Sequence, residues 1–397
     1  MGVFLSFVKT KIVIPAFVGI SALFGINYES EKISFPPKEP QKIEITAVKV
    51  GEQPEQKEET AQAVAGTDKK PENKAVPSAI PEPAKEKAPA KIASYPPLKL
   101  ETIEKMTRGE ILSESAENDK IRGELINIFC TTKTDGYLKP FSGSGIIVSN
   151  AGIILTNAHI AQYFLLKDYN VKDFISCVGR TGSPAMPAYK LELLYVPESW
   201  LSSNAAKIKE ENPSGTGEND YAFLGITGML TQGVSLPSPL PYAEMETNDP
   251  FVAGMPVLLA AYPAGFLGGI TIERNLWITS SVSNIAKLYY FKDSGGTDIF
   301  SIQGNIISQK GASGGAIVSL ISGKLLGLIT TATDSKTTGE RELNAIATPY
   351  IKKAFEKESG KKMGDFFNTP VEILAKEFND GPSQRLIKIM TDAVSGQ

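Results

Sequence analysis

The stretch Gly143-Ser-Gly-Ile-Ile-Val-Ser-Asn-Ala-Gly-Ile-Ile-Leu-Thr-Asn-Ala-His159 decides the fold. Two apolar runs flank Asn150-Ala-Gly152, a combination typical of a turn between paired strands. We therefore predict a buried hairpin, after which the chain leaves the sheet and presents His159 to a cleft. His159 is the only histidine in the chain. A lone histidine is more often structural, but imidazole is also the usual base for a hydroxyl nucleophile at neutral pH.

A serine between glycines supplies the candidate nucleophile. Residues 309–318 read Gln-Lys-Gly-Ala-Ser-Gly-Gly-Ala-Ile-Val, with Ser313 followed by an apolar strand. Gly311 allows the backbone to curl so that its N–H and that of Ser313 converge into an oxyanion hole. Alone, this segment would as readily be a Ser/Gly-rich turn. The histidine motif upstream makes the catalytic interpretation more specific.

An aspartate lies between these two segments. Residues 215–224 read Gly-Thr-Gly-Glu-Asn-Asp-Tyr-Ala-Phe-Leu, which places Asp220 immediately before an apolar run. An acid at the start of a buried strand can hold a carboxylate beside an imidazole. The alternative is a turn aspartate that caps the strand. The candidate triad is therefore His159, Asp220 and Ser313.

The rest of the pattern indicates an all-β domain followed by helices. Short Val/Ile/Leu runs separated by Gly, Pro, Ser and Asn clusters recur from residue 124 to about residue 350. Such spacing, without alternating helices, predicts a barrel or sandwich. A polar helix is expected over 100–118. Residues 350–393 return to helical periodicity and predict two or three helices.

Composition excludes several classes of function. The chain has 397 residues, a net charge of −3 and no basic tract with interleaved aromatics, so nucleic-acid binding is not expected. The two cysteines have no neighbours at metal-ligand spacing. We expect one large folded domain that needs neither a metal nor an organic cofactor.

The N-terminus has the pattern of an export signal. An uncharged, mostly apolar run spans residues 12–26, with Lys9 and Lys11 before it. The run is short for a spanning helix, which needs about 20 residues, and no convincing cleavage site follows it. We favour an uncleaved signal anchor over residues 1–27 rather than a cleaved signal. The positive flank then stays in the cytoplasm and the rest of the chain lies outside, which predicts a single-pass protein of the cytoplasmic membrane.

A tether should connect this anchor to the folded domain. Eleven of the 26 prolines lie between residues 31 and 99, where charged residues are many and aromatics few. Such a segment cannot bury enough apolar surface to fold. We expect residues 28–99 to be a disordered linker.

Together these motifs resemble the trypsin-like peptidases of the bacterial, HtrA-related type. The order His, Asp, Ser agrees with that family, and residues 254–265 resemble the strand and turn of its second barrel. The resemblance covers about residues 124–350 and implies two six-stranded barrels with a cleft between them. It implies that Ser313 is the nucleophile, His159 the base and then the acid, and Asp220 the residue that orients the imidazole. The amides of Gly311 and Ser313 would bind the oxyanion.

The resemblance also implies a specificity pocket. By position relative to the serine motif, the pocket would be lined by Ile307, Thr330, Thr331 and Ala332. None is charged, so we expect a small or medium aliphatic side chain before the scissile bond. Cys130 and Cys177 fall in or beside strands of the first barrel. In an oxidising compartment a disulfide between them is favoured over two buried thiols.

These expectations define four segments and one activity. They are the anchor, the linker, a protease domain over residues 100–350 and a helical extension over residues 351–397, too short for a PDZ domain. The predicted function is a serine endopeptidase that hydrolyses extracytoplasmic proteins or peptides. The alternatives are a catalytically silent binding module with the same barrels and an esterase with the same triad. The oligomeric state is left open.

Overall fold

The structure is a computed structural model that describes residues 112–133, 140–210, 215–265, 267–291, 295–303, 305–332 and 342–396. All of these belong to one compact unit that spans residues 83–397. The predicted signal anchor and linker lie outside the described residues. Among the helices that are described, none has the length and apolar character needed to cross a bilayer.

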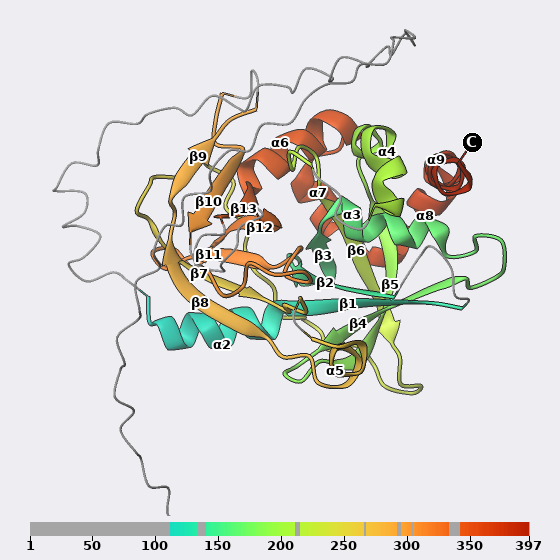
Figure 1. Cartoon of the computed structure of the whole chain (residues 1–397), viewed down its shortest axis with the longest axis horizontal. Coiled ribbons are helices and arrows are strands. Elements are labelled where there is room, and N and C mark those ends of the chain that lie inside the picture. Colours follow the sequence, from blue (N-terminus) through green and yellow to red (C-terminus); the bar gives the residue numbers. More distant parts are fainter. Residues whose placement is uncertain are drawn as a thin grey trace, which may run out of the picture. The chain divides into compact units, whose positions relative to one another are not determined.

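The first six strands form a closed antiparallel barrel (Figure 1). Their order around the barrel is β1-β2-β3-β6-β5-β4. The strands are β1 Leu125–Thr132, β2 Phe141–Ile147, β3 Ile153–Thr156, β4 Ile175–Thr181, β5 Met186–Tyr195 and β6 Ala222–Met229. The predicted hairpin is confirmed, since Ile146 pairs with Leu155 and Ile147 with Ile154.

The second barrel is a half-barrel rather than a closed one, a sheet of seven strands in the order β8-β7-β11-β12-β13-β10-β9. The strands are β7 Pro256–Ala261, β8 Thr279–Asn284, β9 Lys287–Tyr289, β10 Ile299–Gln303, β11 Ala316–Ser319, β12 Leu325–Ala332 and β13 Glu342–Ala347. Six strands were predicted, and the described residues form seven because one long strand is bent. The amide of Ile285 still bonds to Met255 beside β7, whereas the next amide, Ala286, bonds to Ser301 of β10. The bend splits this strand into β8 and β9, the two edges of the sheet.

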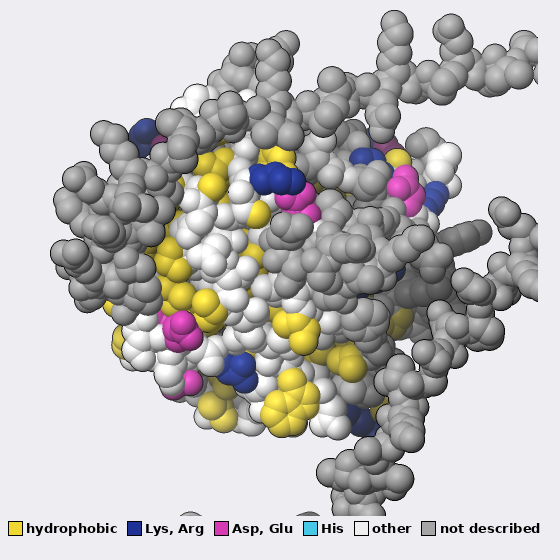
Figure 2. All heavy atoms as spheres, turned by 60° about the vertical axis from the view of Figure 1, so that its left-hand side comes forward, with side chains coloured by type: hydrophobic (Ala, Val, Ile, Leu, Met, Phe, Trp, Pro, Cys, Tyr) yellow, Lys and Arg dark blue, Asp and Glu magenta, His cyan; other side chains and the backbone are white. Residues whose placement is uncertain are grey.

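Most apolar side chains fill the two barrels, but one segment leaves them exposed. Helix α5, Gly269–Arg274, has no buried residue. Ile270 and Trp277 are 72% and 55% exposed. Figure 2 brings the β8 and β9 side forward and shows hydrophobic side chains scattered among white atoms, which are backbone and uncharged side chains, with few charged side chains in the coloured part. Some large apolar side chains of the described residues therefore lie outside the core, on the surface.

A disulfide joins Cys130 of β1 to Cys177 of β4, as predicted. The two cysteines lie directly opposite each other in the register of these neighbouring strands. Cys130 is buried in the first-barrel core. The bond therefore fastens the pair of strands that completes the closed barrel.

Helices precede, connect and follow the barrels (Figure 1). They are α2 Glu114–Glu124, α3 Ala158–Ala161, α4 Glu198–Asn204, α6 Thr348–Ser359, α7 Met363–Asn368, α8 Val371–Asp380 and α9 Ser383–Ser395, with the 3₁₀ turns η1 Gln162–Leu166 and η2 Ala205–Lys209. Helix α2 continues to Glu124, beyond the predicted end at residue 118. After β13 there are four helices rather than two or three, because Gly360, Pro370 and Pro382 stand where helices end or begin.

The last two helices cover the first barrel. Helix α8 packs on β5 and β6, and α9 packs on η1, η2 and α4. Leu386 and Met390 of α9 are buried in the same apolar cluster as Ile160, which follows His159. The helical extension is therefore part of the domain that carries the histidine.

Candidate active site

His159 lies on the short helix α3, directly after β3. The preceding Asn157 is fully buried, and its side-chain amide donates to the backbone carbonyl of Asp220 at 2.8 Å. The side chain of Gln162 donates to the carbonyl of His159 at 2.9 Å. The histidine segment is thus held from both sides, while the imidazole remains 31% exposed.

Asp220 ends a tight turn at the entrance to β6. Its amide bonds back to Gly217, and Asn219 has a left-handed backbone with φ of 57°. The hydroxyl of Tyr350 donates to the Asn219 side chain at 2.8 Å, which fixes this turn. The carboxylate is 7% exposed. The turn therefore presents a nearly buried charge to its neighbours.

Three hydrogen bonds are donated to the Asp220 carboxylate. The backbone amide of His159 donates to Oδ1 at 3.0 Å, and imidazole Nδ1 lies 2.8 Å from Oδ2. The hydroxyl of Thr330 donates to Oδ2 at 2.8 Å. Hydrogen bonds to an ionised group are stronger than neutral ones, so this set holds both the acid and the imidazole in place.

Mutual attraction shifts the pKa values of the pair in opposite directions. Burial alone would lower the pKa of His159, but the charge of Asp220 and the hydrogen bond to it raise that pKa above 6.5. Burial alone would raise the pKa of Asp220, but His159 and Thr330 hold that pKa below its ordinary value. An ionised carboxylate only accepts hydrogen bonds. Nδ1 therefore carries the proton, and Nε2 of the neutral imidazole has a free lone pair.

Ser313 lies in the turn before β11, beside Thr330. Its hydroxyl donates to the backbone carbonyl of Thr330 at 3.1 Å. No hydrogen bond joins Ser313 to His159 among the described residues. The pairing of β12 with β13 shifts register between Ile329 and Thr331, so Thr330 occupies a β-bulge. Through its hydroxyl and its carbonyl, Thr330 connects the acid to the candidate nucleophile.

The turn that precedes Ser313 contains the two amides that were predicted to bind an oxyanion. The Lys310 carbonyl accepts from the Ala264 amide at 2.7 Å, whereas the amides of Gly311 and Ser313 donate to no group among the described residues. Gly311 has φ of 90°, and a Cβ there would lie 2.9 Å from atoms of Ala264 and Tyr262. Only glycine fits this backbone. Two unpaired N–H groups are therefore available to a ligand.

The predicted pocket residues have different surroundings. Ile307 is fully buried in the apolar cluster of the second barrel, together with Ala312 and Ile329. Thr330 is 4% exposed and turns its hydroxyl to Asp220. Thr331 and Ala332 lie on β12, and their side chains are outside the described set. The prediction did not include the role of Thr330 at the acid, nor Ser144, which bonds to the serine turn and lies in the Gly-Ser-Gly motif that opens the hairpin.

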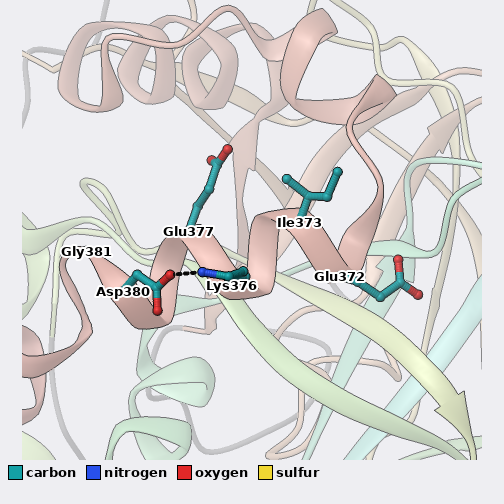
Figure 3. A pocket seen from close by; sticks show the side chains of 6 residues that line it. All are labelled: Glu372, Ile373, Lys376, Glu377, Asp380 and Gly381. Atoms are coloured by element: carbon teal, nitrogen blue, oxygen red, sulfur yellow. Dashed lines mark hydrogen bonds and ion pairs between the residues drawn. The ribbon is translucent and has the colours of Figure 1, made fainter.

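A hollow of about 550 Å³ lies along α8, away from these residues. Figure 3 shows its lining side chains along this helix, with an ion pair between Lys376 and Asp380. Its lining consists of Glu372, Ile373, Lys376, Glu377, Asp380 and Gly381. It contains none of the candidate site residues.

Comparison with known proteins gives one family match. Residues 143–328 match the model of the trypsin-like peptidase domain. No curated protein sequence is significantly similar to the chain. Among solved structures, the chain is similar to a serine endoprotease from Yersinia pestis, with 20% identity, a TM-score of 0.38 and coverage of 62% of this chain and 66% of the other. It is also similar to the HtrA-type protease AlgW, solved with a tripeptide, with 20% identity, a TM-score of 0.39 and coverage of 63% and 65%. The chain thus spans just under two thirds of the length of these structures.

Proposed function

Because the chain carries a trypsin-like peptidase domain over residues 143–328, we propose that it is a serine endopeptidase. Its nucleophile is Ser313, its general base is His159, and Asp220 orients the imidazole. The observation that carries the proposal is a series of hydrogen bonds that links the three residues through Thr330. His159 and the Thr330 hydroxyl both bond to the Asp220 carboxylate, and the Thr330 carbonyl accepts from the Ser313 hydroxyl. This series brings together three segments that are distant in sequence and have the chemistry of acyl transfer.

The proposed mechanism uses the protonation states of the pair. Nε2 of neutral His159 takes the proton of the Ser313 hydroxyl as the oxygen attacks a peptide carbonyl. Asp220 remains ionised and stabilises the imidazolium that results. The imidazolium then gives its proton to the leaving amine, which leaves an acyl-enzyme, and water activated by His159 releases the acid. The hydroxyl must first leave the Thr330 carbonyl.

The amides of Gly311 and Ser313 stabilise the charge that develops on the carbonyl oxygen. Both N–H groups lack a partner among the described residues, so no hydrogen bond to a described residue has to break before they bind an oxyanion. Preorganised donors of this kind are a large term in acyl transfer, since removal of one costs about 10²- to 10³-fold in kcat.

The proposed substrates are proteins or peptides with a small or medium aliphatic residue before the scissile bond. The support is that Ile307 lies in an apolar cluster that contains no carboxylate, where a buried Lys or Arg side chain would lack a partner. Cleavage of a mixed peptide library followed by mass spectrometry tests this preference. Cuts mainly after Lys or Arg would contradict it.

We place the domain outside the cytoplasm, tethered by the N-terminal segment. The disulfide supports this location, because such bonds persist in oxidising compartments. The apolar run over residues 12–26, with its lysine flank, supports the tether. Protease protection of intact and permeabilised cells that express the whole chain tests the orientation. A domain that resists digestion in intact spheroplasts would contradict it.

A fluorophosphonate probe tests the activity directly. The domain should be labelled at Ser313, and Ser313→Ala should abolish both labelling and peptide cleavage. Ser322→Ala, a substitution at an exposed serine, is the matched control and should behave as the wild type. Absence of serine-dependent labelling in folded protein would refute the proposal and favour a catalytically silent binding module. Labelling together with ester hydrolysis, but no cleavage of any peptide, would favour an esterase.

A further inference from the structure

Ser144 of the first barrel bonds to the serine turn of the second. The residue is fully buried on β2. Its hydroxyl donates to the Gly311 carbonyl at 2.9 Å and accepts from the Tyr262 amide at 2.9 Å. Its backbone amide donates to the Ser313 carbonyl at 2.8 Å. One residue therefore connects both residues that carry the proposed oxyanion donors to the end of β7.

The serine turn needs such a connection because its glycines make it adaptable. Gly314, like Gly311, has a positive φ, of 82°. A Cβ on Gly314 would lie 1.9 Å from the carbonyl oxygen of Ser144, so the backbones of these two segments approach too closely for any side chain at this position. Glycine peptides can rotate with little steric penalty. Hydrogen bonds, rather than side-chain packing, must therefore hold the turn in one conformation.

The carbonyls of residues 310 to 313 each have a donor, and that of Ala312 accepts from the Gly315 amide within the turn at 2.9 Å. The Lys310 carbonyl is held by Ala264, the Gly311 carbonyl by the Ser144 hydroxyl, and the Ser313 carbonyl by the Ser144 amide. The Gly311 carbonyl depends on a side chain, and a single substitution removes that bond. Its loss would also leave the Tyr262 amide without an acceptor in a buried place.

We infer that the Ser144 hydroxyl is a positioning group for the oxyanion hole. It does not touch the reacting atoms. It holds the Gly311 carbonyl against β7, so that the amides of Gly311 and Ser313 keep the directions that the transition state requires. This role rests on the proposed peptidase function, and it adds to the triad a residue that couples the first barrel to the oxyanion donors.

Ser144→Ala tests the role kinetically. The rate per active site, titrated with the fluorophosphonate, should fall about 10- to 100-fold in kcat with KM nearly unchanged. The loss is smaller than the 10²- to 10³-fold for a deleted donor because both donors remain but are less ordered. A peptide aldehyde, whose adduct oxygen occupies the hole, should lose affinity by the same factor, whereas the cleaved product peptide should not. The acid limb of the pH profile should not move, since Ser144 contacts neither His159 nor Asp220.

Two further variants separate positioning from general stability. Ser144→Thr keeps the hydroxyl and should restore kcat. Ser142→Ala lies on the same strand and removes a hydroxyl that accepts from Asn127 rather than from the turn, so its kcat should stay within about two-fold of the wild type. If Ser144→Ala fails to fold, Ser144→Cys, which keeps the shape but donates weakly, should show the same loss. An unchanged kcat per titrated site, with only a lower melting temperature, would overturn the inference.

Hydrogen exchange distinguishes failure of this inference from failure of the proposed function. Peptides that cover residues 309–315 should exchange faster in Ser144→Ala than in Ser142→Ala, whether or not the protein is active. If the wild type is not labelled by the fluorophosphonate but this difference is present, only the proposed function fails. If the wild type is active and the exchange of this segment is unchanged in Ser144→Ala, only the positioning role fails.

Discussion

Replacement of Asp220 by asparagine tests the tautomer that the site imposes on His159. The amide has one acceptor and one donor where the carboxylate has two acceptors. If its NH₂ group faces the backbone amide of His159, now 3.0 Å from Oδ1, two donors oppose each other and neither can adapt. If it takes the place of Oδ2, it faces imidazole Nδ1 and the Thr330 hydroxyl. The hydroxyl can rotate and the imidazole can move its proton to Nε2, so the second orientation is favoured.

The expected loss follows from two terms. An unsatisfied buried donor costs about 1–3 kcal/mol, which favours the wrong tautomer of His159 about 5- to 160-fold. Loss of a hydrogen bond to a charged acceptor costs a further 1.5–3 kcal/mol as the imidazolium forms. Together they predict a kcat about 10²- to 10⁴-fold below the wild type.

The assay is hydrolysis of a chromogenic peptide at pH 8, with the rate divided by the concentration of folded protein. Asp168→Asn is the matched control, because Asp168 is an exposed acid whose one hydrogen-bond partner in the described part of the chain is the Asp173 amide. The control should stay within about two-fold of the wild type. Asp220→Asn activity within ten-fold of the wild type, in folded protein, would refute the tautomer argument.

Three further predictions concern pH, the disulfide and the helical cover. The acid limb of kcat/KM should have a midpoint above 6.5, because His159 must be neutral to accept a proton and its pKa is raised; a midpoint below 6.5 would contradict the Asp220 contact. Joint replacement of Cys130 and Cys177 by alanine should lower the free energy of unfolding by up to about 4 kcal/mol, because the bond closes a loop with a sequence separation of 47 residues. Urea denaturation measures this loss, and an unchanged free energy of unfolding would show that the bond does not constrain the unfolded chain. A Cβ on Gly225 would lie 2.4 Å from Val371 of α8, so Gly225→Ala should lower the melting temperature and Val371→Ala should partly restore it; additive losses in the double variant would contradict this packing.

The trypsin-like, mostly β fold is confirmed, and the reason is that its signals are local. A hairpin such as residues 143–159 is specified by its own turn and by apolar runs that pair with each other. The apolar run that became β11 likewise pairs with the next strand, β12. The bend at Ile285 was not predicted, because its cause is a change of partner from Met255 to Ser301. No short stretch of sequence encodes which strand will be the neighbour.

Thr330 shows where sequence reasoning about the site reached its limit. Position relative to the serine motif predicts a pocket wall, yet the hydroxyl donates to Asp220, 110 residues away. The β-bulge at this point interrupts the alternation of side chains along β12. A pattern of period two therefore cannot predict which way the residue faces. Ser144 was missed for a similar reason, since its partners at 262, 311 and 313 belong to the other barrel.

The position of α9 implies an order in which the contacts of the first barrel form during folding. Helix α9, residues 383–395, packs on the turn η1, residues 162–166, which is synthesised about 220 positions earlier. Contacts across so long a separation form late, because the intervening chain must first be ordered. During synthesis, which proceeds from the N-terminus, the first barrel therefore lacks this cover until α9 itself has been made. A chain interrupted before α9 would lose Leu386 and Met390 from the apolar cluster of the first barrel, so we expect it to be less stable and more readily degraded than the whole chain.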